Sequence, residues 1–189
     1  MKIILAKSAG FCFGVKRAVD TVYQQVLLNQ GKIYTYGPII HNEEVVKDLE
    51  EKGVCVVATR EQLKECRDGT VIIRSHGVGK EIYNLLKENQ ISYVDATCPF
   101  VRKIHQIVEQ YSREDYHVVI IGNENHPEVE GIKGWSSNLD ATTVISTHQE
   151  AENFVLKDGK KACIVSQTTF NNKKFQELVE IIQKKGYDI

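Results

Sequence analysis

The sequence is short of proline, tryptophan and methionine, and it lacks both a charge excess and a long apolar run. With three prolines in 189 residues and no Pro/Gly/Ser-rich stretch, no flexible linker is expected. The formal net charge of −1 gives no overall field that would attract nucleic acid. No apolar run approaches the length of a membrane span, and the opening MKIILAKSAG lacks the long apolar region of a signal peptide. We therefore expect a cytoplasmic protein without nucleic-acid or membrane partners.

The number of cysteines argues against a disulfide framework. Five cysteines cannot all pair with one another, and in a protein expected to be cytoplasmic they leave room for metal or redox chemistry. Cys55 and Cys163 lie in apolar strand-like runs and Cys66 lies near a helix end, so we interpret these three as structural. Cys12 and Cys98 are left as candidates for chemistry.

Short apolar runs alternate with helical patterns along the chain. Hydrophobic residues make up 42% and charged residues 26%, as in an ordinary globular protein. Strand–helix alternation at this spacing is typical of α/β folds with largely parallel sheets. The expected strands are KIILA (2–6), KIYTY (32–36), VCVVA (54–58), TVIIR (70–74), ISYV (91–94), HVVII (117–121), TTVIS (142–146) and KACIVS (161–166).

Helix signals follow most of these strands. Residues 15–29 and 171–185 carry apolar side chains at helical spacing, and residues 42–52 are a further expected helix. Helix starts are marked by an N-cap at Asn42 and by two capping boxes, Thr59-x-x-Gln62 and Thr147-x-x-Glu150.

Two motifs recur in the same order and at nearly one offset. Cys12-Phe-Gly-Val-Lys-Arg and Cys98-Pro-Phe-Val-Arg-Lys share the pattern C-x-x-V-basic-basic. Gly37-x-x-x-His41-x-Glu43 and Gly122-x-x-x-His126-x-Glu128 share the pattern G-x-x-x-H-x-E. The repetition indicates two copies of one α/β unit, at residues 1–95 and 96–189.

Cys98 stands where a helix should begin. In DATCPFVRK, Thr97 can act as N-cap, Pro99 suits the first turn, and residues 101–111 continue at helical spacing. The positive end of the helix favours thiolate at Cys98, and the repeat gives Cys12 the same setting. Both thiolates are therefore candidate ligands for a soft metal centre.

Polar residues follow several of the expected strands. These are His41, His76, His126 with Glu128, and Thr168 with its neighbour Thr169. Ligands bind at the carboxyl ends of parallel strands, so the side chains can converge if the two units face a common cleft. Histidines and threonines near helix starts and Gly-rich turns suit a phosphate or diphosphate, and Glu128 can transfer a proton. The pattern indicates a reductase acting on a phosphorylated small molecule.

Six motifs, spread over nearly all of the chain, carry a resemblance to a known family. AGFCFGVKRAVD, GPIIHN, RSHGV, DATCPFV, HPEVEG and SQTT resemble the LytB/IspH family of 4-hydroxy-3-methylbut-2-enyl diphosphate reductases. The resemblance implies three α/β units with pseudo-threefold symmetry around a 4Fe-4S cluster, each unit supplying one cysteine. It also implies reduction of an allylic diphosphate to isopentenyl and dimethylallyl diphosphates in the non-mevalonate isoprenoid pathway, with ferredoxin or flavodoxin as electron donor.

The resemblance also implies a role for each candidate residue. Cys12 and Cys98 would bind the cluster, His41, His76 and His126 would hold the diphosphate, Glu128 would deliver a proton, and Thr168 would lie near the substrate hydroxyl. Extrapolating the repeat places a third copy near position 184, where the sequence reads KKGYDI and ends. We therefore expect the third unit and its cluster cysteine to be absent from this chain, and expect this truncated form to be inactive.

Two other functions stay open from the residues alone. His41, His76, His126 and Glu128 can bind zinc in a hydrolase, although no H-x-x-x-H or C-x-x-C pair is present. A non-catalytic diphosphate-binding module is the second alternative. Two residues also have purely structural interpretations, Glu128 as an acid at a helix start and Thr168, with Thr169, as a cap of the last helix.

Overall fold

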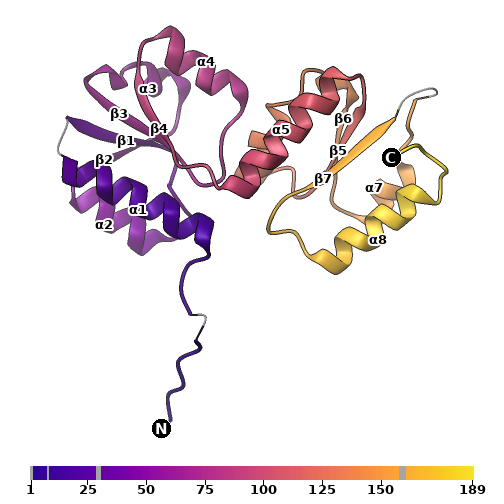
Figure 1. The fold of residues 1–189 in the computed structure, drawn as a ribbon, viewed down its shortest axis with the longest axis horizontal. Helices are drawn as coiled ribbons and strands as arrows, with labels where there is room; N and C mark the ends of the chain where they lie inside the picture. Colours follow the sequence, from indigo (N-terminus) through magenta and orange to yellow (C-terminus); the bar gives the residue numbers. More distant parts are fainter. Residues whose placement is uncertain (1, 8, 29–30, 158–160) are drawn as a thin grey trace. The chain divides into compact units, whose positions relative to one another are not determined.

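The computed structural model describes residues 2–7, 9–28, 31–157 and 161–189, which form two parallel sheets flanked by helices (Figure 1). Contacts within the chain divide it into two units. Unit 1 comprises Met1–Ser75 with Ser92–Cys98, and unit 2 comprises His76–Ile91 with Pro99–Ile189. The predicted α/β class with largely parallel sheets is confirmed. The proposed repeat boundary between residues 95 and 96 stays a prediction.

Unit 1 contains a four-stranded parallel sheet in the order β2-β1-β3-β4. Its strands are β1 (Lys32–Tyr36), β2 (Val54–Val57), β3 (Gly69–Ile73) and β4 (Ser92–Asp95). Helices α1 (Phe13–Leu28) and α2 (Glu43–Glu51) pack on one face, where Val22, Leu49 and Ile72 meet in a single core (Figure 1). The remaining short elements are α3 (Arg60–Lys64) and a 3-10 turn, η1 (Cys66–Asp68).

Unit 2 contains a three-stranded parallel sheet in the order β6-β5-β7, covered on both faces. The central strand alternates its side chains between two cores: Val119 and Ile121 pack with Leu178 in one, and Val118 and Ile120 pack with Ile132 in the other. Its strands are β5 (His117–Ile121), β6 (Thr142–Ile145) and β7 (Ala162–Ser166). Its helices are α4 (Lys80–Glu88), α5 (Pro99–Arg113), α6 (Pro127–Lys133), α7 (His148–Asn153), α8 (Asn172–Gln183) and the 3-10 turn η2 (Leu139–Ala141).

The first three strands of each sheet are arranged in the same order. In each, the first strand lies between the second and the third, and in unit 1 a fourth strand, β4, pairs with β3. The repeated G-x-x-x-H-x-E motif follows the first strand of each sheet along the chain, β1 and β5. The repeated cysteine motifs in turn lead into α1 and α5. Equivalent sequence positions thus occupy equivalent places in the two sheets.

Several helix starts form as the local sequence predicts. The side chain of Asn42 accepts a hydrogen bond from the Val45 amide. Both capping boxes are complete, with the threonine and the residue three positions later bonding each other's backbone. These helix boundaries are therefore set by side chains within one turn.

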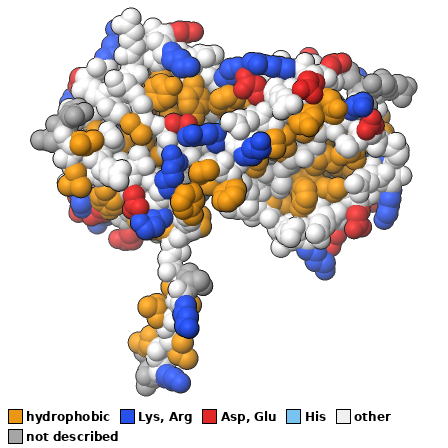
Figure 2. Space-filling model, in the orientation of Figure 1, with side chains coloured by type: hydrophobic (Ala, Val, Ile, Leu, Met, Phe, Trp, Pro, Cys, Tyr) orange, Lys and Arg blue, Asp and Glu red, His pale blue; other side chains and the backbone are white. Residues whose placement is uncertain are grey.

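Other expectations about boundaries are wrong. Residues 2–6 form no strand: Ile3, Ile4 and Leu5 are 82%, 78% and 84% exposed, and apolar side chains of this segment stand open to solvent in Figure 2. A strand is stable only when it pairs and buries a face, and neither described sheet includes this segment. The helix expected over 15–29 begins two residues earlier, at Phe13, and Asn29 lies outside the described residues.

Two expected caps are also replaced by neighbouring residues. Helix α5 begins at Pro99, so Cys98 rather than Thr97 directly precedes it. Helix α8 is capped by Asn171, whose side chain accepts a hydrogen bond from the Lys174 amide, and not by the two threonines before it. Within the described residues, no helix combines the length and apolar character needed to cross a membrane.

Candidate active site

In unit 1, three strand ends are tied together by hydrogen bonds. The Ile39 carbonyl, after β1, accepts from the Ser75 amide at 3.2 Å and from the Ser75 hydroxyl at 3.0 Å. The Ser75 carbonyl, after β3, accepts from the Cys98 amide at 2.9 Å, after β4. Ser75 is buried, so these bonds are shielded from water. The backbone of Cys98 is therefore fixed, and His41 follows two residues after one of the tied positions.

The thiol of Cys98 lies against the first turn of α1. A Cβ atom placed on Gly14 would come within 2.4 Å of Cys98 Sγ and 3.1 Å of Cys98 Cβ. Only glycine leaves room for the sulfur at this position. Cys12 precedes Gly14 by two residues and is exposed. The fold thus brings the Cys98 thiol to the chain segment that carries Cys12.

Arg17 connects α1 to the segment before Cys98. Its Nη1 donates to the Thr97 carbonyl at 2.9 Å and its Nη2 to the Asp95 carbonyl at 3.4 Å. The Asp95 carboxylate in turn accepts from the Thr97 amide at 2.9 Å. A guanidinium suits this role because its donors form a fixed planar fork. Sequence reasoning missed Arg17, although it is the second basic residue of the repeated cysteine motif.

In unit 2, a buried carboxyl is held by Thr168, the second residue after β7. The Thr168 amide donates to Glu128 Oε1 at 2.6 Å and the Thr168 hydroxyl donates to Oε2 at 2.9 Å. Glu128 is 1% exposed. Burial raises the pKa of Glu128 above the usual glutamate value, and the two bonds from Thr168 oppose that rise. The structure brings together two residues that the sequence places 40 positions apart.

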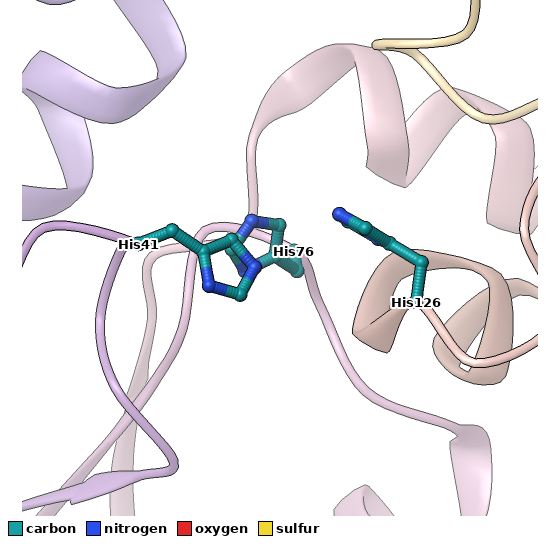
Figure 3. Close-up of side chains that lie close together, drawn as sticks. All are labelled: His41, His76 and His126. Atoms are coloured by element: carbon teal, nitrogen blue, oxygen red, sulfur yellow. The ribbon is translucent and has the colours of Figure 1, made fainter.

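Two of the predicted histidines also meet in unit 2. Figure 3 draws His41, His76 and His126, and the rings of His76 and His126 pack edge to face with centroids 5.5 Å apart. His126 caps α6: its Nδ1 accepts a hydrogen bond from the Glu128 amide at 3.1 Å. When the ring is neutral, its proton is therefore on Nε2, where it can be donated to an anion. His126 and Glu128 are thus fixed by the same helix start.

Gln167 supports the Glu128–Thr168 pair and was not anticipated. Its amide donates to the Ile121 carbonyl at 2.9 Å, and its side-chain oxygen accepts from the Asn123 amide at 3.2 Å. It also donates from Nε2 to the Thr169 hydroxyl at 2.8 Å. Gly122 makes this approach possible, because a Cβ there would lie 3.0 Å from Gln167 Cβ. The SQTT motif was the sequence signal for Gln167.

The other three cysteines lie in different surroundings. Cys66 is buried, its thiol donates to the Gln62 carbonyl at 3.3 Å, and burial raises its pKa. Cys163 lies in β7, where burial raises its pKa to about 11. Cys55 is an exposed residue of the edge strand β2. Burial thus disfavours thiolate at Cys66 and Cys163.

The two sheets and their loops define an α/β protein whose strand ends carry thiols, histidines and a buried carboxyl. A model of the LytB protein family matches residues 3–189. The chain belongs to the LytB family, as the sequence motifs predicted.

Curated relatives and solved structures agree with this assignment. The chain is 45% identical, over its whole length, to the 4-hydroxy-3-methylbut-2-enyl diphosphate reductase of Caldanaerobacter subterraneus subsp. tengcongensis, and 44% identical to that of Alkaliphilus oremlandii. It spans 65% and 66% of the length of these two relatives.

Two solved structures have the same fold. The E-1-hydroxy-2-methyl-but-2-enyl-4-diphosphate reductase of Plasmodium falciparum matches 95% of this chain with a TM-score of 0.87 at 29% identity, over 55% of its own length. A second, titled as the (E)-4-hydroxy-3-methyl-but-2-enyl diphosphate reductase that ends the non-mevalonate pathway, matches 96% with a TM-score of 0.77 at 42% identity, over 63% of its length.

Proposed function

We propose that this chain contributes two of the α/β units of a 4-hydroxy-3-methylbut-2-enyl diphosphate reductase of the non-mevalonate isoprenoid pathway. The observation that carries the proposal is the buried Glu128–Thr168 pair beside His126. A buried carboxyl with a raised pKa is a proton donor suited to neutral pH. The relatives named as reductases, at 44–45% identity over the whole chain, supply the reaction class.

The proposed cofactor is a 4Fe-4S cluster with Cys12 and Cys98 as two of its ligands. The residues present fit such a group. Cys12 is exposed, and the Cys98 thiol lies in space that is available because residue 14 is a glycine without a side chain. Cys66 and Cys163 fit it poorly, since burial raises the pKa of both thiols. The third cysteine ligand is proposed to come from outside residues 1–189. When bound, the cluster supplies electrons at the substrate.

The residues of this chain would bind the diphosphate and supply a proton. His41, His76 and His126 are proposed to donate hydrogen bonds to the diphosphate oxygens. Loss of the substrate hydroxyl as water requires a proton, which Glu128 is proposed to hold before transfer. Thr168 is proposed to lie near that hydroxyl, with its own position set by Glu128. Ferredoxin or flavodoxin is the proposed electron donor.

Anaerobic reconstitution with iron and sulfide tests this proposal. In the complete enzyme, the wild type, Cys98→Ser and Cys163→Ser should be compared for bound iron, bound sulfide and turnover of the allylic diphosphate with a chemical reductant. We expect Cys98→Ser to lower bound iron and Cys163→Ser to leave it unchanged. Unchanged iron and activity in Cys98→Ser would remove that residue from the ligand set.

Metal content, turnover and diphosphate binding also distinguish the reductase from the two other candidate functions. A hydrolase would bind zinc in place of iron and sulfide and would release phosphate without a reductant. A non-catalytic module would bind inorganic diphosphate equally well after both Cys12 and Cys98 are replaced by serine. For this chain alone we predict no reductase turnover, so measurable turnover would show that two cysteines, or two copies of the chain, are sufficient.

A further inference from the structure

We infer that Gly134 and Trp135, at the end of α6, position the His76 ring against His126. The contact joins residues Val78–Lys80, which follow His76, to Gly134 and Trp135. All of these residues belong to unit 2. Only the role of the two rings in binding a diphosphate rests on the proposed function.

The loop that carries His76 needs external support. His76 is followed by Gly77, which has a φ of +69°, and Gly79 comes two residues later. Glycine loses more conformational freedom on folding than any other residue, so an isolated segment of this composition would sample many conformations. Contacts that hold the residues after His76 therefore help to keep its ring in one position.

Two hydrogen bonds and one close approach hold the loop. Trp135 Nε1 donates to the Val78 carbonyl at 2.9 Å, and the Lys80 amide donates to the Gly134 carbonyl at 3.2 Å. A Cβ placed on Gly134 would come within 2.6 Å of Gly79 Cα, so the two backbones lie in direct contact. These contacts attach the loop to the C-terminal end of α6.

The Trp135 indole is itself fixed by neighbouring helices. His105 of α5 is buried and stacks on it with ring centroids 5.2 Å apart, and Tyr83 of α4 packs on it at 5.6 Å. Lys80 also forms an ion pair with Glu109 of α5 at 2.5 Å. The donor at Nε1 is thus directed at Val78 by packing on two helices.

Helix α6 contacts the residues that set the positions of both His76 and His126. His126 caps its first turn, and Gly134 is its C-cap, about 12 Å further along at 1.5 Å per residue. Val129 and Ile132 are fully buried, so the helix cannot shift without disturbing the core. One short rigid element thus fixes the His126 ring at its start and the His76 loop at its end, which sets the edge-to-face pair in Figure 3.

Two glycine-to-alanine variants of α6 give a matched test. Gly134→Ala places a methyl group against the Gly79 backbone, although its φ of −67° and ψ of −4° are allowed for alanine. Gly131→Ala, one turn earlier, meets Gly77 and Val78 at 3.5 Å, which is ordinary van der Waals contact. Both changes add one methyl group to the same helix, and only the first forces the loop to move.

The readouts are the proton NOE between the His76 and His126 rings and the affinity for inorganic diphosphate. We expect Gly134→Ala to weaken the NOE and to lower the affinity about tenfold, as for loss of one charge-assisted hydrogen bond. Gly131→Ala should match the wild type in both. Trp135→Phe, which keeps an aromatic ring but removes the donor to Val78, should change both readouts in the same direction as Gly134→Ala.

The inference is overturned if Gly134→Ala and Trp135→Phe keep the wild-type NOE, or if Gly131→Ala loses it equally. If Gly134→Ala does not fold, comparison of Trp135→Phe with Gly131→Ala decides the question. If the NOE changes as expected but the wild type binds no inorganic diphosphate, the positioning role stands and the proposed role of these histidines fails.

Discussion

Thr168 donates to both carboxyl oxygens of Glu128, from its amide at 2.6 Å and from its hydroxyl at 2.9 Å. This pair joins the loop after β7 to the first turn of α6. Because the carboxyl is 1% exposed, its protonation depends on these two donors and on burial rather than on solvent. Burial is the larger effect, and it raises the pKa.

Thr168→Val should raise the pKa of Glu128 further. The variant removes the hydroxyl that donates to the charged form, while the amide donor of residue 168 remains. Thr168→Ser keeps a hydroxyl and should stay close to the wild type. A carbon-13 titration of the Glu128 carboxyl in the three proteins measures the effect. A pKa that is unchanged or lower in Thr168→Val would contradict it.

Glu128→Gln should remove a pH dependence of stability. A carboxyl whose pKa is raised on folding contributes stability that is present below its unfolded pKa, near 4.5, and lost as pH rises through the folded pKa. The wild type should therefore lose stability relative to Glu128→Gln above about pH 4.5, by about 1.4 kcal/mol for each pH unit that separates the unfolded pKa from the folded pKa. Urea unfolding of both proteins between pH 4 and 8 checks the sign. A difference that is constant with pH would contradict it.

Glu128→Gln should also abolish turnover of the complete enzyme while leaving iron content unchanged. Glutamine keeps an oxygen for the Thr168 amide and fills nearly the same volume, but it cannot release a proton. Turnover and bound iron of the reconstituted protein are the measurements. Near-normal turnover would remove Glu128 from the proposed proton-transfer step.

Arg17→Ala should destabilise the protein, whereas Lys16→Ala should not. Arg17 donates to the Thr97 and Asp95 carbonyls, and its removal leaves these half-buried acceptors without that donor. The expected loss is about 1–3 kcal/mol of the free energy of unfolding. Lys16 is exposed and forms an i,i+4 ion pair with Asp20, so its removal should cost less than about 0.5 kcal/mol. Equal losses in the two variants would contradict the role of Arg17.

Gly14→Ala should displace the Cys98 thiol without weakening the helix. Alanine is favoured over glycine in a helix by up to about 1 kcal/mol, but its Cβ would lie 2.4 Å from Cys98 Sγ. We expect lower bound iron after reconstitution and an altered alkylation rate at Cys98. Gln24→Ala, at an exposed position of the same helix, is the control. Unchanged iron and alkylation would show that the sulfur does not depend on the space at Gly14.

The sequence predicted the elements that are specified locally. The short apolar runs from residue 32 onward and the capping boxes at Thr59 and Thr147 depend on neighbours within a few positions, and they form strands and helix starts as expected. The internal repeat predicted two equivalent units, which stays a prediction, and the first three strands of the two sheets are arranged in the same order. Segment 2–6 shows the limit, because a strand also needs a partner, which its own residues cannot specify.

The site was predictable as a set of residues but not as a set of contacts. Motifs identified Glu128 and Thr168 separately, yet their double hydrogen bond depends on the positions of β5 and β7 in one sheet. Arg17 and Gly14 belong to the repeated cysteine motif that begins at Cys12, but the sequence assigned neither residue a role. Their contacts lie about 80 residues away in the chain, a separation that no local pattern reveals.

The five cysteine thiols should differ in their rates of alkylation. A thiol that reacts slowly because it is buried and protonated is also a poor metal ligand. Alkylation proceeds through the thiolate, and a pKa of about 11 leaves on the order of one Cys163 thiol in a thousand ionised at pH 8. Cys66 is buried and also has a raised pKa. We expect both to react slowly with iodoacetamide, while the exposed Cys12 and Cys55 react fast.

Peptide mapping by mass spectrometry at pH 8 and pH 9 measures these rates in the folded protein. The Cys163 rate should rise roughly tenfold over this one-unit interval, because its thiolate fraction does. Labelling in urea supplies the control, since all five thiols should then react at similar rates. If Cys163 reacts as fast as Cys12 in the folded protein, burial does not protect it, and its exclusion from the proposed ligand set would no longer hold.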